Sequence, residues 1–69
     1  MTKIILTLSQ YHHILESNPW IEGDIKNLED LLLLLQDSHN SVYVTRDDTE
    51  IMKLEFDPQE TNQVKEIPL

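Results

Sequence analysis

The chain has no cysteine, and this absence excludes both disulfides and thiolate metal sites. Small domains often depend on such cross-links, because a chain of 69 residues buries only about 60% of the surface that it exposes when unfolded. We therefore expect a single hydrophobic core. The lack of cysteine also fits a reducing compartment such as the cytoplasm.

Basic residues are also few: 5 lysines and arginines face 13 aspartates and glutamates, for a net charge of −8. Such an excess repels phosphate backbones and anionic lipids, so we expect no direct contact with nucleic acid or membranes. No long apolar run is present, because the runs at residues 4–8 and 31–35 are too short for a signal-peptide core or a bilayer span. We predict a cytoplasmic protein, in the host cytoplasm if a phage encodes it.

Glycine occurs only once, and 39% of the residues are hydrophobic, so most of the chain is expected to fold. The exception is the polar segment 59–69, where Val64, Ile67 and Leu69 are isolated apolar residues. This segment could dock as an extended arm, but its composition favours fraying. We predict a compact domain over residues 1–58 and a flexible tail over 59–69.

The N-terminal region is predicted to form a strand over residues 3–8, followed by a helix. Thr7 and Gln10 have the spacing of a capping box, which would start a helix at Leu8 that ends near Asn18-Pro19. Its core face would contain Leu8, Tyr11, His12 and Leu15. The alternative is that the strand continues through Tyr11.

A second helix is predicted over roughly residues 25–37, with Asp24 as its N-cap. Its apolar residues follow the helical i, i+3, i+4, i+7 pattern and are Ile25, Leu28, Leu31, Leu32 and Leu35. Leu33 falls in the middle of the opposite, polar face, with Leu34 at the edge of the apolar stripe. Either a partner covers Leu33, or it is an ordinary exposed leucine.

The single tryptophan, Trp20, is expected to close the core.

Residues 42–46 and 50–56 are predicted to form a β-hairpin around Asp47-Asp48. One register gathers the apolar residues on a single face by pairing Val42 with Leu54 and Val44 with Met52. That register needs a loop of three or five residues, because a two-residue loop would place Lys53 beside Val42. The fold is therefore α+β, with two helices packed on a small antiparallel sheet that contains the hairpin and that the N-terminal strand could join.

The histidines do not form a recognisable metal site. His12 and His13 point about 100° apart on a helix, so they cannot converge on one ion, and either one paired with Glu16 would need further ligands. Asp47, Asp48 and the nearby Glu50 lack the spacing and the glycine of a calcium loop. We predict that the protein holds no metal and no other cofactor.

The sequence also lacks the usual signs of catalysis, with no glycine-bounded serine and no glycine-rich phosphate loop. Ser9, His12 and Glu16 could be assembled into a triad, but all three would project from one helix without a pocket around them. We therefore predict that the protein is not an enzyme.

The remaining feature is charge, which gathers in two clusters. The helix cluster contains Glu29, Asp30 and Asp37, and the hairpin cluster contains Asp47, Asp48 and Glu50. Carboxylates spread over a compact body can imitate the phosphates that a basic groove binds, although acidic surfaces also keep small proteins soluble. In size and charge the chain resembles the small acidic inhibitors that phages use against host nucleases, including anti-CRISPR proteins and anti-restriction DNA mimics. No residue motif contributes to this resemblance.

The function predicted from these features is inhibition of a larger protein by occupation of its basic, nucleic-acid-handling surface. The partner-binding residues would be the two acidic clusters together with Leu33. The alternative is a homodimeric accessory or antitoxin-like subunit that assembles through an apolar seam of Leu33, Leu34 and an open sheet edge.

Overall fold

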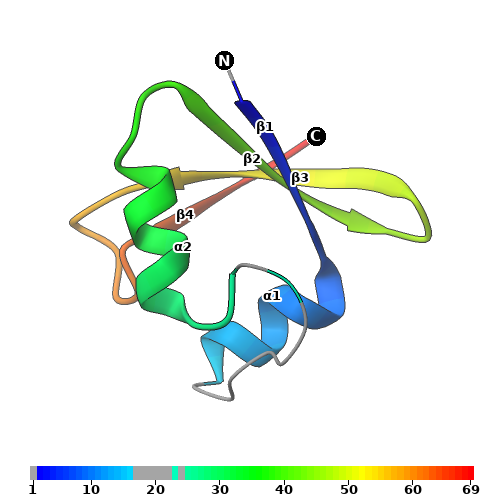
Figure 1. Ribbon diagram of the computed structural model, residues 1–69, viewed down its shortest axis with the longest axis horizontal. Helices are drawn as coiled ribbons and strands as arrows, with labels where there is room; N and C mark the ends of the chain where they lie inside the picture. The colour runs from blue at the N-terminus through cyan, green and yellow to red at the C-terminus, as the bar shows by residue number, and fades with distance from the viewer. Residues whose placement is uncertain (1, 17–22, 24) are drawn as a thin grey trace.

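The computed structural model describes residues 2–16, 23 and 25–69. In this part of the chain two helices cover one face of a four-stranded sheet, as Figure 1 shows, and this confirms the predicted α+β fold. The elements in chain order are β1 (Thr2–Thr7), α1 (Leu8–Leu15), α2 (Leu28–Leu35), β2 (Asn40–Arg46), β3 (Thr49–Phe56) and β4 (Val64–Pro68).

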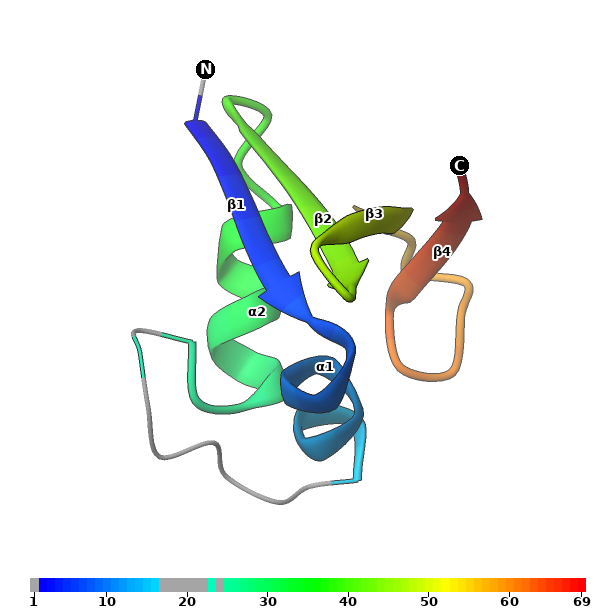
Figure 2. The ribbon, with the colours of Figure 1, turned by 90° about the vertical axis from the view of Figure 1, so that its right-hand side faces the viewer.

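The sheet has the strand order β1-β2-β3-β4 and is mixed rather than purely antiparallel. β1 runs parallel to β2, whereas the other two neighbouring pairs are antiparallel. The reason is the connection between β1 and β2, which passes through both helices and returns the chain in its original direction, as parallel pairing requires. Figure 2 shows β1 and β4 at the two edges of the sheet.

The predicted cap of α1 is confirmed, because the Thr7 hydroxyl accepts a 3.1 Å hydrogen bond from the Gln10 N–H. The predicted core face is confirmed for Tyr11, which is buried, and for Leu8 and Leu15, which pack against the core. It is wrong at one position, because His12 is exposed and Ile14 is buried instead. β1 continues into α1 without a loop, so the place of β1 in the sheet fixes which side of α1 meets the core. The predicted end at Asn18-Pro19 lies outside the described residues, as does Trp20.

α2 begins later than predicted, at Leu28, because Asn27 caps it by accepting a 2.9 Å hydrogen bond from the Asp30 N–H. The Asp30 carboxylate in turn accepts the Lys26 N–H at 3.1 Å, one residue before the cap. Ile25 is buried, yet it precedes the helix. The helix also ends earlier than predicted, at Leu35, and Asp24, the predicted cap, lies outside the described residues.

The predicted hairpin register is confirmed by the pairs Val42–Leu54 and Val44–Met52. The predicted loop length is wrong, because the turn has only two residues, Asp47 and Asp48, with φ of 52° and 64°. Positive φ at both central residues is typical of a type I′ turn. The pairing changes by one residue next to Val44, so a β-bulge in β3, and not the loop, supplies the odd residue that this register requires.

The C-terminal segment differs from its prediction as a flexible tail, because residues 64–68 form β4 and pair with β3. Two features hold it there. Val64 is buried in the core, and the connecting loop is closed by a 3.0 Å hydrogen bond from the Asp57 N–H to the Gln63 carbonyl. The compact fold therefore extends beyond residue 58.

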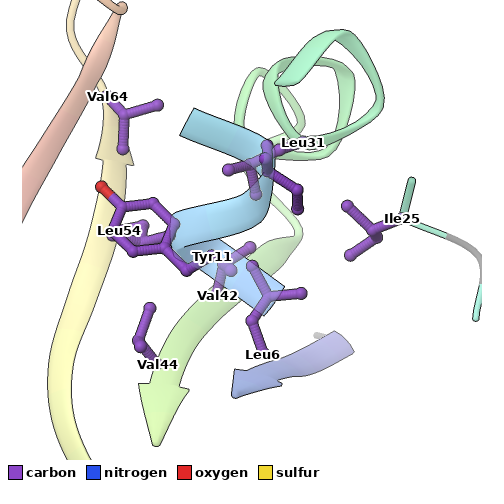
Figure 3. Close-up of a cluster of buried hydrophobic side chains, with 9 residues drawn as sticks. Leu6, Tyr11, Ile25, Leu31, Val42, Val44, Leu54 and Val64 are labelled. Atoms are coloured by element: carbon purple, nitrogen blue, oxygen red, sulfur yellow. The ribbon is translucent and has the colours of Figure 1, made fainter. Parts of the chain in front are cut away.

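The core lies between the helices and one face of the sheet (Figure 3). Its buried members are Leu6, Tyr11, Ile14, Ile25, Leu31, Val42, Val44, Leu54 and Val64. In α2, Leu31 is fully buried, and the other leucines of the predicted stripe, Leu28, Leu32 and Leu35, are half-buried against this cluster. No described helix covers the other face of the sheet, which we call the open face.

Candidate interaction surfaces

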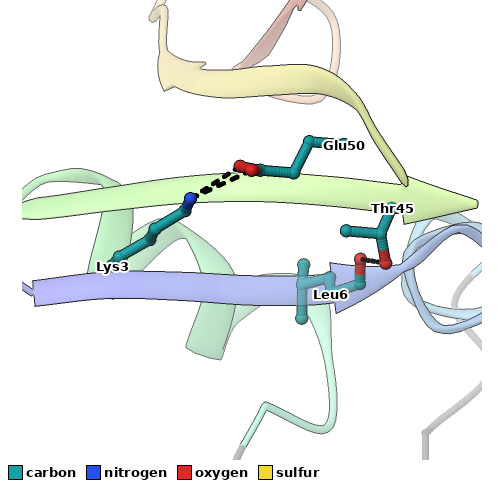
Figure 4. Close-up of polar contacts among 4 residues, drawn as sticks. All are labelled: Lys3, Leu6, Thr45 and Glu50. Atoms are coloured by element: carbon teal, nitrogen blue, oxygen red, sulfur yellow. Dashed lines mark hydrogen bonds and ion pairs between the residues drawn. The ribbon is translucent and has the colours of Figure 1, made fainter. Parts of the chain in front are cut away.

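The ion pair between Lys3 and Glu50 joins β1 to β3 across β2 on the open face (Figure 4). The Lys3 Nζ lies 2.8 and 2.9 Å from the two carboxylate oxygens of Glu50. It also lies 4.8 Å from the centroid of the Tyr43 ring. The hydrogen bond to Glu50 raises the pKa of Lys3, so the lysine stays charged at neutral pH. The charge of Glu50, a predicted partner-binding residue, is therefore compensated within the chain.

Asp47 and Asp48 differ from Glu50 in having no such compensation. Both are exposed at the β2–β3 turn, which extends beyond the helices in Figure 1. Lys3–Glu50 is the one lysine or arginine ion pair among the described residues, so every other described carboxylate lacks such a partner. The hairpin therefore presents two adjacent, uncompensated carboxylates.

Two members of the helix cluster have structural roles that the sequence did not indicate. Asp30 is half-buried and holds the Lys26 N–H, and the Asp37 carboxylate accepts a 2.9 Å hydrogen bond from the His39 N–H. Glu29 is exposed on α2. In Figures 1 and 2, α2 lies on the opposite side of the molecule from the β2–β3 turn, so the fold does not join the two acidic clusters into one surface.

The predicted apolar seam is divided by the fold. Leu33 is 64% exposed, whereas Leu34 packs against the core. Ile5, the exposed apolar residue of the edge strand β1, lies on the open face, away from the helix layer that carries Leu33. The helix part and the sheet-edge part of the seam therefore belong to different surfaces.

The open face is a surface that the sequence reasoning missed. The strand registers align Ile5, Tyr43, Lys53 and Ile67 in one row across all four strands. The same face holds Lys3 and Lys65, so three of the five basic residues of this acidic chain lie there. The alternation of side chains along a strand is enough to place these residues opposite the core. Their alignment in one row could not be predicted without the parallel β1–β2 pairing.

Among the described residues, Tyr11 is the titratable side chain whose pKa the fold shifts most. Burial raises its pKa above the ordinary value for tyrosine, and a hydrogen bond to Glu66 raises it further. The phenol therefore keeps its proton at neutral pH, as a structural donor does. His12 and His13 are exposed, and the described residues contain no group of three or more histidine, aspartate or glutamate side chains arranged to hold a metal ion.

No family model, curated protein or solved structure matches the chain. The helices of the described residues are too short to cross a membrane.

Proposed function

We propose that this chain is a non-enzymatic binding protein that inhibits a larger partner by occupying its basic, nucleic-acid-handling surface. The observation that carries the proposal is the pair Asp47 and Asp48, exposed at a projecting turn without a lysine or arginine partner. A basic groove that binds phosphates attracts adjacent carboxylates by the same electrostatics. The likeness in size and charge to phage inhibitors of host nucleases supports the same function.

Two of the predicted partner-binding residues already have partners within the chain. Glu50 is paired with Lys3, and the Asp30 carboxylate accepts the Lys26 N–H, so neither is fully available to a partner. The two acidic clusters lie on opposite sides of the molecule, so one flat surface of a partner cannot contact both. We assign the primary contact to Asp47 and Asp48, and a peripheral role in steering to Glu29 and Asp37.

The test begins with capture of the partner from the native host, followed by competition with duplex DNA. The complex should dissociate as DNA is added, and the inhibited activity should return. Asp47→Asn combined with Asp48→Asn removes both charges, and asparagine tolerates the positive φ of the turn. Glu60→Gln, at an exposed loop position, is the matched control. A complex that DNA does not displace and that the double variant does not weaken would contradict the proposal.

A second candidate function is an accessory or antitoxin-like interaction subunit. The observation that favours it is Leu33, which is 64% exposed on α2. If a partner covers this side chain, Leu33→Glu should abolish assembly and leave the chain folded. Assembly that is unchanged in Leu33→Glu would remove this candidate.

A further inference from the structure

The edge strand β1 presents unpaired backbone groups along its free side. The Thr2 N–H donates to the His39 carbonyl at 2.8 Å, so residue 2 faces β2. The Leu6 carbonyl accepts the Thr45 hydroxyl at 3.4 Å, so residue 6 also faces β2 (Figure 4). Since successive residues of a strand point their N–H and C=O groups to opposite sides, Lys3, Ile5 and Thr7 face away from β2. No described strand lies beyond β1.

The other edge of the sheet is protected against pairing. The Leu69 N–H donates to the Ile51 carbonyl at 3.2 Å, so Val64, Glu66 and Pro68 are the β4 residues that face outward. The Val64 N–H is already bound to the Asn62 side chain at 3.0 Å, and Pro68 has no N–H. A proline and a charged residue are common devices that block edge pairing.

β1 is protected less than β4. Residues 2–7 contain no proline, and their one charged side chain, Lys3, is compensated by Glu50. Ile5 is 55% exposed on this strand. An apolar, unprotected edge of this kind pairs readily with another strand.

We propose that two copies of this chain pair through antiparallel β1 strands about a twofold axis at Ile5. The outward-facing residues are centred on Ile5, so this edge is complementary to itself, as a twofold interface requires. Ile5 of each copy exchanges both backbone hydrogen bonds with Ile5 of the other. The Thr7 N–H of each copy donates to the Lys3 carbonyl of the other, and the two sheets become one.

Side chains and charge also favour a second copy at this edge. The two Ile5 side chains meet at the axis and cover each other, and on the helix side Ile4 of one copy lies opposite Leu6 of the other. Lys3 lies opposite Thr7, so no like charges face each other. β1 contains no acidic residue, so the two negatively charged chains meet where local repulsion is least.

This inference is independent of the proposed function, because it uses the strand edge and leaves Asp47 and Asp48 free. The two associations also respond oppositely to salt. Screening should strengthen contact between two copies that each carry −8, whereas it should weaken binding to a basic partner. The variant with Asp47→Asn and Asp48→Asn should still dimerise.

Sedimentation equilibrium over a concentration series tests the pairing. The mass of the unmodified chain should rise from 8.1 kDa to about twice that value. Ile5→Lys should weaken the dimer at least tenfold, because it places two lysines opposite each other at the axis. Leu33→Lys, at a similarly exposed leucine on α2, should leave the dimer unchanged. Circular dichroism of each variant verifies that it is folded.

Cross-linking tests the register and also decides the question if Ile5→Lys does not fold. Because the chain has no cysteine, Ile5→Cys introduces a single thiol at the axis, where the paired Cα atoms are about 5.5 Å apart and within disulfide range. Mild oxidation should give a covalent dimer, whereas Leu33→Cys should give little. A chain that stays monomeric, a dimer unaffected by Ile5→Lys, or equal cross-linking through Leu33→Cys would each overturn the inference.

Discussion

The Tyr11 hydroxyl donates a 2.5 Å hydrogen bond to the Glu66 carboxylate, which lies 55 residues further along the chain. Tyr11 is fully buried on α1, and Glu66 is exposed on β4. The bond therefore connects the first helix to the last strand of the sheet, and it helps to explain why a polar C-terminal segment is ordered.

We expect Tyr11→Phe to destabilise the fold by about 1–2 kcal/mol, since hydrogen bonds to charged groups contribute about 1.5–3 kcal/mol and Glu66 can regain water. The loss should be concentrated at β4. Urea denaturation measures the total, and hydrogen exchange of residues 64–67 measures the local part. Tyr43→Phe, on the open face, is the control. Unchanged exchange in β4 would show that the bond does not hold the strand.

The raised pKa of Tyr11 predicts a loss of stability at alkaline pH. Folded Tyr11 holds its proton more tightly than the unfolded chain, whose tyrosines titrate near pH 10. The stabilisation is therefore complete below about pH 10 and is lost as the pH rises above it. Denaturation midpoints between pH 8 and 11 should fall less steeply in Tyr11→Phe than in the unmodified chain. Parallel curves would contradict this assignment.

Truncation of α2 leucines should separate buried from exposed positions. Leu31→Ala removes a fully buried side chain and should cost about 2–5 kcal/mol, enough to unfold much of so small a domain. Leu33→Ala should change stability by less than about 0.5 kcal/mol in the isolated monomer. Thermal melts of the two variants at low protein concentration provide the comparison. Equal losses would mean that the helix is rotated from the orientation described.

Asp48→Gly should raise stability while it weakens partner binding. Asp48 has a φ of 64°, which glycine adopts without strain, and Asp-Gly is a favoured type I′ sequence. We expect a gain of up to about 1 kcal/mol by urea denaturation, with Thr49→Gly, in the following strand, as a destabilising control. If aspartate is retained there for binding rather than for the turn, stability and affinity should change in opposite directions. A loss of stability in Asp48→Gly would contradict the turn assignment.

Local signals in the sequence were sufficient to predict several features of the fold. The Thr7 cap, the Val42–Leu54 pairing and the exposure of Leu33 follow from neighbouring residue types and from periodicity. The start of α2 was harder to predict, since the cap is Asn27 and the helix begins at Leu28 rather than near residue 25. Features that depend on distant residues could not be read in this way. The parallel β1–β2 pairing and the burial of Val64 arise from tertiary contacts that no short window contains.

The same limit applied to the candidate site. The sequence identified the acidic residues, but it could not show that Lys3 compensates Glu50 across 47 positions or that the Asp30 carboxylate binds the Lys26 N–H. Nor could it show that the two acidic clusters lie apart. The structure therefore separates Glu50 and Asp30, which have partners within the chain, from Asp47 and Asp48, which are exposed together at one turn.

The central claim is that Asp47 and Asp48 bind a basic surface by charge. The most direct measurement is the affinity of the captured partner across a salt series, for the unmodified chain and for Asp47→Asn combined with Asp48→Asn. We predict that affinity falls steeply with salt for the unmodified chain, and that the double variant binds at least tenfold more weakly with a shallower salt dependence and slower association. Equal affinities and equal salt dependence for the two chains would contradict the claim.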